Sequence, residues 1–237
     1  AVAQSLLYPL WDAGLSVGHQ VVTVADLVTA SRQDFPTATS LLDWRFVAGH
    51  RPLSDDLLTR VRAGIFSTSE LPVFLDQLEV AVEVRHRRFG GSVYLLEPDV
   101  KNGPGALRDV DVARWAARAR WMVGDFDELV RLGALVPRQL EAVLEARETL
   151  WRIRNLLHDR AGRRSDRLSF DEQEAIAPRL GYQGSPAEAV ERMMSDYYRA
   201  ARTINRFRDT ILGRARPALE RRRVGTVHVA LGLEKLD

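Results

Sequence analysis

The strongest constraint on the fold is a series of helix-forming stretches in the second half of the chain, each bounded by glycine or proline. Apolar spacing and these breakers predict helices over 107–122, 126–132, 137–161, 170–180 and 186–212. Such apolar stripes are buried when helices pack together, so the sequence predicts a mainly α protein whose helical-bundle core covers about residues 105–213. The stripe of 137–161 is the widest and comprises Leu140, Val143, Leu144, Leu150, Trp151, Ile153, Leu156 and Leu157.

The beginning of the chain predicts a different, α/β character. Residues 1–10 are typical of the end of a helix, and residues 15–22 are typical of a buried strand. Thr23 is a candidate N-cap for the helix that follows. Because the chain starts with Ala1 inside a helix pattern, we expect it to begin in the middle of a larger protein.

Between this part and the bundle, the pattern predicts short elements. A short helix falls within 34–50, Ser54 is expected to cap a helix that ends at Arg62, and a longer helix covers 71–88. Residues 92–96 are expected to be extended, and the apolar residues 224–233 after a basic run predict a short strand.

Composition excludes several classes of protein. Of 237 residues 46% are hydrophobic and 28% charged, which suits a soluble protein with a core. No apolar run reaches the roughly 18 residues that a membrane span needs, so no membrane partner is expected. The net charge of +2 is too small to indicate nucleic acid. The absence of cysteine excludes disulfides and fits a cytoplasmic protein, and the five histidines lack metal-ligand spacing, so no metal site is predicted.

The stretch 97–109, EPDVKNGPGALRD, is the most specific in the chain. Its Gly-Pro-Gly cannot sit inside a helix, so it predicts a flexible loop that opens onto a helix N-terminus. Free amides and the positive dipole end of a helix suit a phosphate, and Lys101 and Arg108 add positive charge beside Asp99 and Asp109. The alternative is an ordinary turn into a helix, with a solvated rim.

This stretch closely resembles a motif of the bacterial PII uridylyltransferase family, usually written E-P-x-V-K-x-G-P-G-G-L-R-D. The departure is Ala106, where the family usually has a third glycine. A looser K-x-G-x-G-G-x-x-D form marks the related glutamine synthetase adenylyltransferases. The resemblance implies an enzyme that uses Mg²⁺ and transfers UMP from UTP to a tyrosine of the PII signal protein.

Three further stretches are similar to the same family. Residues 150–168 match L-W-x-x-R-x-x-L-H-x-x-x-G-R-x-x-D-x-L, and residues 189–201 match a helix with M-x-x-Y-Y-R-x-A, whose Met193 and Tyr197 we expect in the core. Residues 10–23 resemble L-W-D-x-G-L-x-V-G-H-S-V-R-T, the last part of the nucleotidyltransferase domain, although Gln20 and Val22 depart from it. The resemblance therefore divides the chain into the end of a nucleotidyltransferase domain, 1–52, and a helical domain, 53–237.

The resemblance also implies roles for individual residues. It places nucleotide-phosphate contacts at Lys101, Gly103, Gly105 and Arg108. It assigns the wall of the cleft, or contact with the protein substrate, to Asp109, Arg154, His158, Arg163 and Asp166. It implies as partners the PII protein and the remainder of a longer polypeptide, which carries a metal-dependent uridylyl-removing domain and ACT domains.

The catalytic signature of this superfamily is a Gly-rich turn followed by Asp-x-Asp, whose carboxylates hold Mg²⁺. Asp109-Val110-Asp111 imitates it only superficially, because it lies at a predicted helix start. We therefore expect the catalytic acids upstream of Ala1 and the chain alone to be inactive. Open alternatives are a structural role for Arg154 and Asp166, an adenylyltransferase-like or other nucleotidyltransferase module, and a non-catalytic interaction domain.

Overall fold

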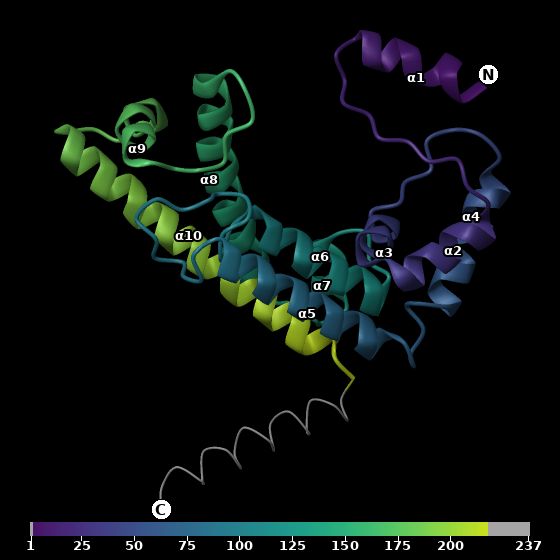
Figure 1. Ribbon diagram of the computed structural model, residues 1–237. Helices are drawn as coiled ribbons and strands as arrows, with labels where there is room; N and C mark the ends of the chain where they lie inside the picture. Colours follow the sequence, from purple (N-terminus) through teal and green to yellow (C-terminus); the bar gives the residue numbers. More distant parts are fainter. Residues whose placement is uncertain (1, 218–237) are drawn as a thin grey trace, which may run out of the picture.

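The computed structural model describes residues 2–217, and this part of the chain is built from ten α-helices and one short 3₁₀-helix (Figure 1). The helices of the first part are α1 (Val2–Asp12), α2 (Val24–Gln33), α3 (Phe35–Leu42), α4 (Arg51–Ala63) and α5 (Leu71–Arg88). Those of the second part are α6 (Leu107–Trp121), α7 (Phe126–Arg131), α8 (Pro137–Ala161), α9 (Phe170–Ile176), η1 (Pro178–Leu180) and α10 (Pro186–Ala215).

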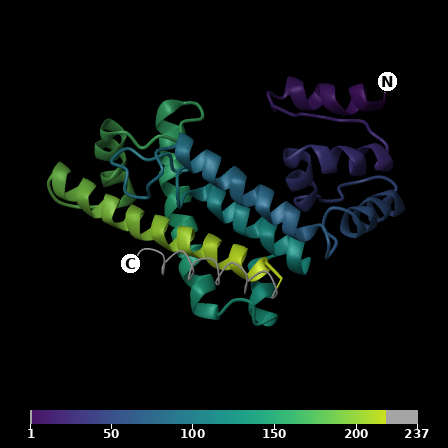
Figure 2. The ribbon, with the colours of Figure 1, turned by 60° about the horizontal axis from the view of Figure 1, so that its bottom comes forward.

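The longest helix, α10, forms the spine of the bundle. It packs against α6, α8 and α9, and α5 lies along α6 (Figures 1 and 2). Side chains of these helices fill one continuous apolar core, in which Leu150, Ile153, Met193, Tyr197 and Ile204 are fully buried. The predicted mainly α bundle and the core positions of Met193 and Tyr197 are confirmed.

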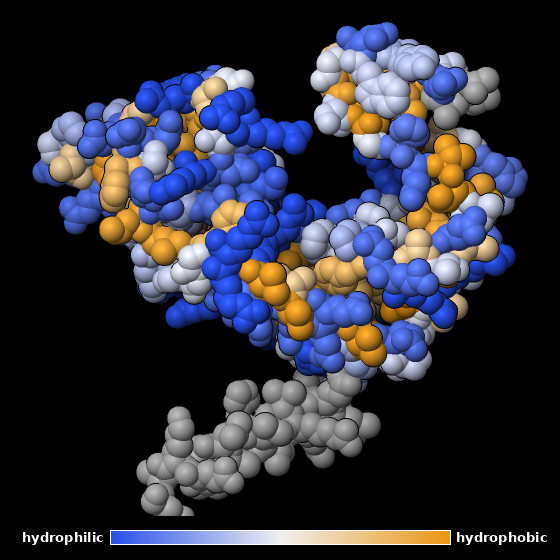
Figure 3. All heavy atoms as spheres, in the orientation of Figure 1, coloured by the Kyte–Doolittle hydropathy of each residue, from blue (hydrophilic) through white to orange (hydrophobic). Residues whose placement is uncertain are grey.

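Helices α2, α3 and α4 form a second group, in which α2 packs on α3 and α4, and α3 contacts α6. The helix α1 stands apart from the rest in both ribbon views (Figures 1 and 2). In the same orientation as Figure 1, the space-filling view shows a hollow between α1 on one side and α8 on the other (Figure 3). The overall shape is therefore concave on this face.

Most predicted helices are confirmed, two of them at both ends: 71–88 and 137–161. Thr23 caps α2 as predicted, because its Oγ1 accepts the Asp26 N–H at 3.1 Å. The predicted helix 170–180 is two elements, since Pro178 has no N–H to continue the α-helical pattern. The last helix continues past Gly213 to Ala215.

Several predictions for the first part are wrong. Residues 15–22 form no strand: the segment has no ladder partner among the described residues, and Val21 is 81% exposed. An α/β character of residues 1–52 is therefore not seen. Ser54 does not cap α4, which begins at Arg51; its buried Oγ accepts the Trp44 Nε1–H at 2.9 Å. Residues 92–96 form turns instead of an extended run, and the strand predicted at 224–233 lies outside the described residues.

The division into 1–52 and 53–237 stays a prediction; α4 spans it. Within residues 2–217, none of the helices combines the length and the apolar character of a membrane span.

Candidate functional site

Residues 97–106 form the loop that precedes α6, the central loop. Most of its amides donate hydrogen bonds within the protein. The Asp99 carboxylate accepts the N–H groups of Lys101 and Asn102, at 3.0 and 2.6 Å. The N–H groups of Leu107 and Arg108, in the first turn of α6, donate to the carbonyls of Val100 and Lys101. The predicted flexible loop is instead largely buried and internally hydrogen-bonded, so an anion bound here has to be held by side chains.

The two glycines of Gly-Pro-Gly are required by packing. Gly105 has a φ of +71°, and a Cβ built on it would lie 2.2 Å from the carbonyl oxygen of Ala201 in α10. A Cβ on Gly103 would lie 2.7 Å from the carbonyl oxygen of Asp99. Both positions exclude any side chain, because the backbone of the loop approaches other backbone too closely. The glycines therefore let the loop seat directly on α10.

Asp109 is the buried centre of the site. Its carboxylate is 0% exposed, and it accepts hydrogen bonds from Arg85 of α5 and Arg208 of α10, each at 2.5 Å. His86 Nε2 lies 3.1 Å away, and the Gly105 N–H donates to the same carboxylate at 2.8 Å. One side chain thus ties α5, α6, α10 and the central loop together.

The protonation of Asp109 follows from these partners. Burial alone raises the pKa of a carboxyl group, but the His86 hydrogen bond and the charges of Arg208 and Arg85 outweigh it and lower the pKa of Asp109 to about 2. Asp109 is therefore ionised at neutral pH, with all its lone pairs engaged. It positions the loop and has no capacity left for a ligand.

A second cluster lies where α8 meets the segment before α9. Asp166 Oδ1 accepts Arg154 Nε–H at 2.7 Å and lies 3.0 Å from His158 Nε2. Burial raises the pKa of Asp166, but these two hydrogen bonds and the charges of Arg154 and Lys101 lower it further than burial raises it. The predicted site residues Arg154, His158 and Asp166 are thus brought together, and Lys101 directly follows Val100, whose N–H donates to the Asp166 carbonyl.

The two motif-bearing segments are joined by backbone pairing. Residues Asp99 and Arg167 form an antiparallel bridge, with the Val100 N–H donating to the Asp166 carbonyl at 2.8 Å. Beside it, Arg167 donates to Glu97 at 2.6 Å. The central loop and residues 166–168 therefore form one surface, although about 70 residues of sequence separate them.

Arg108 and Arg163 lie outside this cluster. The Arg108 side chain is one-third exposed and turns along α6, with its guanidinium 3.2 Å from Asp111 and 5.7 Å from the centre of the Trp115 ring. Arg163 is exposed in the turn that follows α8. The structure thus places one predicted cation, Lys101, beside Asp166 and leaves two others accessible elsewhere.

The sequence reasoning missed Arg85, His86 and Arg208, which complete the surroundings of Asp109. The available signal was indirect: a carboxylate predicted at a helix start beside Gly-Pro-Gly needs positive partners if it is buried. Pattern alone could not say which of the many arginines they are.

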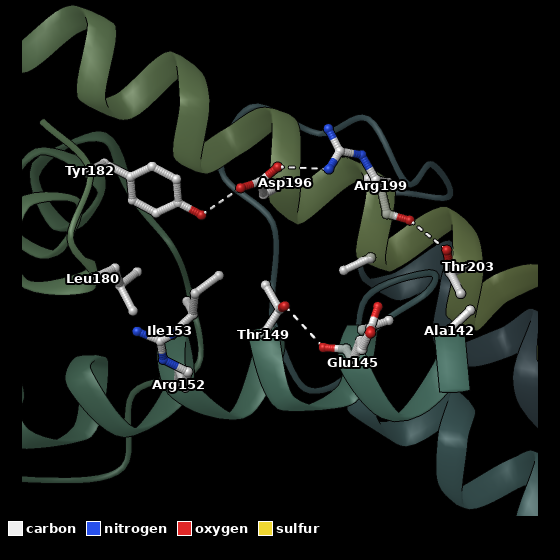
Figure 4. Close-up of a pocket in the computed structure, with 12 residues that line it drawn as sticks. Ala142, Glu145, Thr149, Arg152, Ile153, Leu180, Tyr182, Asp196, Arg199 and Thr203 are labelled. Carbon is white, nitrogen blue, oxygen red and sulfur yellow. Dashed lines mark hydrogen bonds and ion pairs between the residues drawn. The ribbon is translucent and has the colours of Figure 1, made fainter. Parts of the chain in front are cut away.

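Another hollow, of about 390 Å³, lies between α8 and α10, and none of the predicted site residues lines it (Figure 4). Its polar side chains are partly engaged with each other: the Tyr182 hydroxyl donates to Asp196 at 2.9 Å, and Asp196 pairs with Arg199 at 3.1 Å (Figure 4). Burial and the Asp196 contact raise the pKa of Tyr182 to about 12, so this phenol is neutral. The hollow is thus separate from the predicted site residues, although Arg199 of the 189–201 motif lines it.

Within residues 2–217, no three histidine, aspartate or glutamate side chains come close enough to hold a metal ion. The Asp109–Asp111 pair does not suit Mg²⁺, because Asp109 is enclosed by two arginines and Asp111 is paired with Arg108 and Arg114. Residues of this part of the chain therefore do not fit a magnesium site.

Comparisons with known proteins agree with the motifs. A family model described as GlnD PII-uridylyltransferase matches residues 74–212. Proteins named bifunctional uridylyltransferase/uridylyl-removing enzyme are similar to the chain. Those of Bradyrhizobium diazoefficiens and Nitrobacter hamburgensis are 39% identical over 204 residues, 86% of this chain and 22% of each relative. That of Ruegeria pomeroyi is 38% identical over 202 residues, 85% of this chain and 22% of the relative.

The chain thus spans about a fifth of the length of these curated relatives. No solved structure matches it. The family model covers more than half of the chain, including the central loop, the Asp109 network and the Asp166 cluster. The chain belongs to the GlnD PII-uridylyltransferase family.

Proposed function

We propose that this chain is the helical segment of a nucleotidyltransferase that transfers UMP from UTP to a tyrosine of the PII signal protein. In this role it forms one wall of the nucleotide cleft in a cytoplasmic enzyme. The observation that carries the proposal is the convergence of the central loop with Arg154, His158 and Asp166, which holds Lys101 at the edge of a fixed surface. The names of the relatives support the reaction class.

In this proposal the side chains of Lys101 and Arg108 contact the triphosphate. Both are partly accessible, whereas most amides of the loop already donate hydrogen bonds within the protein. Arg108 has a carboxylate partner, Asp111, at 3.2 Å, and a phosphate carries more charge than that carboxylate. Binding therefore exchanges one partner of Arg108 for a stronger one.

Other predicted residues act indirectly in this proposal. Gly103 and Gly105 shape the loop through their contacts with backbone oxygens, and Asp109 anchors it to three helices. Arg163, exposed beyond α8, is available for the protein substrate. The acids that hold Mg²⁺, and the uridylyl-removing activity, belong to the rest of the longer polypeptide. On this basis we expect the chain alone to transfer no UMP.

One observation favours a second candidate. The pairing of most loop amides within the fold suits a non-catalytic helical interaction domain, in which the motif only fastens the loop to α10. Such a domain needs no nucleotide. The two candidates therefore differ in a measurable property, the affinity of the chain for UTP.

We would titrate the chain with UTP in the presence of Mg²⁺ by calorimetry, and repeat the titration with ATP. We expect binding that prefers UTP and weakens by roughly tenfold or more in Arg108→Ala, since one charge-assisted contact to phosphate is lost. The matched control is Arg120→Ala, which removes an exposed arginine from the same helix. An equal loss of UTP affinity in both variants would indicate general attraction between the nucleotide and positive charge. The absence of UTP binding to the unchanged chain would favour the interaction domain.

A further inference from the structure

The contact between α3 and α6 is centred on one carboxylate, that of Asp43. Asp43 directly follows α3, and its two oxygens face three side chains of α6. Trp115 Nε1–H donates to Oδ2 at 2.9 Å, and Arg118 donates to Oδ1 at 2.5 Å. Arg114 Nε lies 3.5 Å from Oδ1. The carboxylate therefore contacts three side chains that span one turn of α6.

A carboxylate at the C-terminal end of α3 is electrostatically unfavourable unless it has positive partners. The C-terminal end of a helix carries partial negative charge, which repels an acidic side chain. Here Arg118 corrects the mismatch, because it donates to the Leu42 carbonyl at 2.9 Å as well as to Asp43. The cations of α6 thus cap α3 and pair with its C-terminal acid in one arrangement.

The remaining contacts between α2–α4 and the bundle are largely apolar. Phe35 of α3 packs on Phe74 of α5 with ring centres 5.7 Å apart, and Phe66 packs on the same ring at 5.1 Å. Apolar burial favours association but is non-directional, so it holds the two parts together without fixing their angle. Most of the directional contacts come from Asp43, with one more from Arg118 to the Leu42 carbonyl, and a network of several partners is more effective than one exposed ion pair.

We propose that Asp43 is a positioning residue, which fixes the angle of helices α2–α4 on α6 and with it the width of the concave face seen in Figure 3. Its meaning for catalysis rests on the proposed function: if residues 1–52 are the end of the nucleotidyltransferase domain, as the resemblance implies, Asp43 sets the position of that domain relative to Arg108 on α6. A chain of ion pairs leads from Asp43 to Arg108: Arg114 lies beside Asp43, and Asp111 pairs with both Arg114 and Arg108. The angular role itself requires no nucleotide.

The chain contains no cysteine, so a pair of introduced cysteines labels two chosen sites alone. We would place nitroxide labels at Ala25→Cys in α2 and Asn155→Cys in α8, both exposed, and measure the distance distribution by pulsed electron paramagnetic resonance. In Asp43→Ala we expect a broader distribution of label-to-label distances. The fraction of molecules away from the native distance should rise roughly tenfold, because the contacts of the carboxylate with Arg114, Trp115 and Arg118 are lost.

The matched control is Asp56→Ala, which removes an ion pair of 3.0 Å made within α4 only and should leave the distribution unchanged. Asp43→Glu should restore part of the native population. Trp115→Phe, which removes the Nε1 donor and also shortens a ring packed against the core, should broaden the distribution partly. If circular dichroism shows that Asp43→Ala does not fold, the same distance measurement on Asp43→Asn, which keeps one acceptor oxygen, tests the proposal instead. An unchanged distribution in a folded Asp43 variant overturns the proposal, whatever the affinity for UTP.

Discussion

Replacing Asp109 by asparagine tests the idea that this buried carboxylate holds the site together. Asp109→Asn keeps the size of the side chain but removes the charge that Arg85 and Arg208 enclose, with guanidinium groups only 15% and 8% exposed. Losing one partner of a buried ion pair costs about 3–5 kcal/mol. Arg85 keeps its bond to the Asn102 carbonyl and Arg208 its bond to Asp209, so we expect a loss near the lower end, about 3 kcal/mol.

The pKa of Asp109 gives a second measure of the same quantity. Its fall from 3.8 to about 2 corresponds to roughly 2.5 kcal/mol in favour of the folded, ionised state. Because the pKa is lowered on folding, this stabilisation is fully present above pH 4 and is lost as the pH falls toward 2. The difference in stability between the wild type and Asp109→Asn should therefore shrink in acid.

The assay is urea unfolding followed by circular dichroism at pH 7, 5 and 3, with Asp111→Asn as the control. Asp111 lies on the same helix, but burial raises its pKa more than Arg114 and Arg108 lower it, so its charged form is not favoured by folding. We expect Asp111→Asn to lower the free energy of unfolding by less than about 1 kcal/mol. A loss in Asp109→Asn no larger than in the control, or one that does not depend on pH, would refute the reasoning.

Three further substitutions test the fold. Gly105→Ala should lower the free energy of unfolding by at least about 3 kcal/mol or prevent folding, because the new Cβ would overlap the Ala201 carbonyl oxygen. A melting curve like that of the wild type would contradict this. Thr23→Ala should weaken the start of α2 by about 1 kcal/mol, detected as faster hydrogen exchange in α2 but not in α10. Val21→Lys should change the free energy of unfolding by less than about 0.5 kcal/mol, because Val21 is exposed; a loss above about 2 kcal/mol would indicate the buried strand that the sequence predicts.

The sequence predicts the elements of the bundle well, because their signals are local. The helix α8 begins at Pro137 and ends before Gly162, whose φ of +61° suits the left-handed residue that closes a helix. Both signals lie within one turn of the helix that they bound. The apolar spacing of α8 and α10 likewise reports which face is buried, whatever the partner is.

The candidate site is predicted only in part. Arg154, His158 and Asp166, which the resemblance assigns to one wall of the cleft, lie in one cluster, whereas Arg163 and Asp109 of the same assignment lie apart from it; the roles themselves stay predictions. A phosphate contact through the glycine amides needs these amides free, but the Gly103 N–H donates to the Asp99 carbonyl and the Gly105 N–H to the Asp109 carboxylate. A motif specifies residue types, but it does not say whether a loop turns its amides outward or into the fold.

The sequence by itself determined which stretches of the bundle are helical, which faces are apolar and which family the motifs resemble, since each of these depends on neighbouring residues. Only the tertiary structure decided that Asp109 pairs with Arg85, 24 residues before it, and Arg208, 99 residues after it. It also decided that Gly105 meets Ala201 and that Asp43 meets α6. Such contacts join distant positions, and their geometry exists only once the helices have packed.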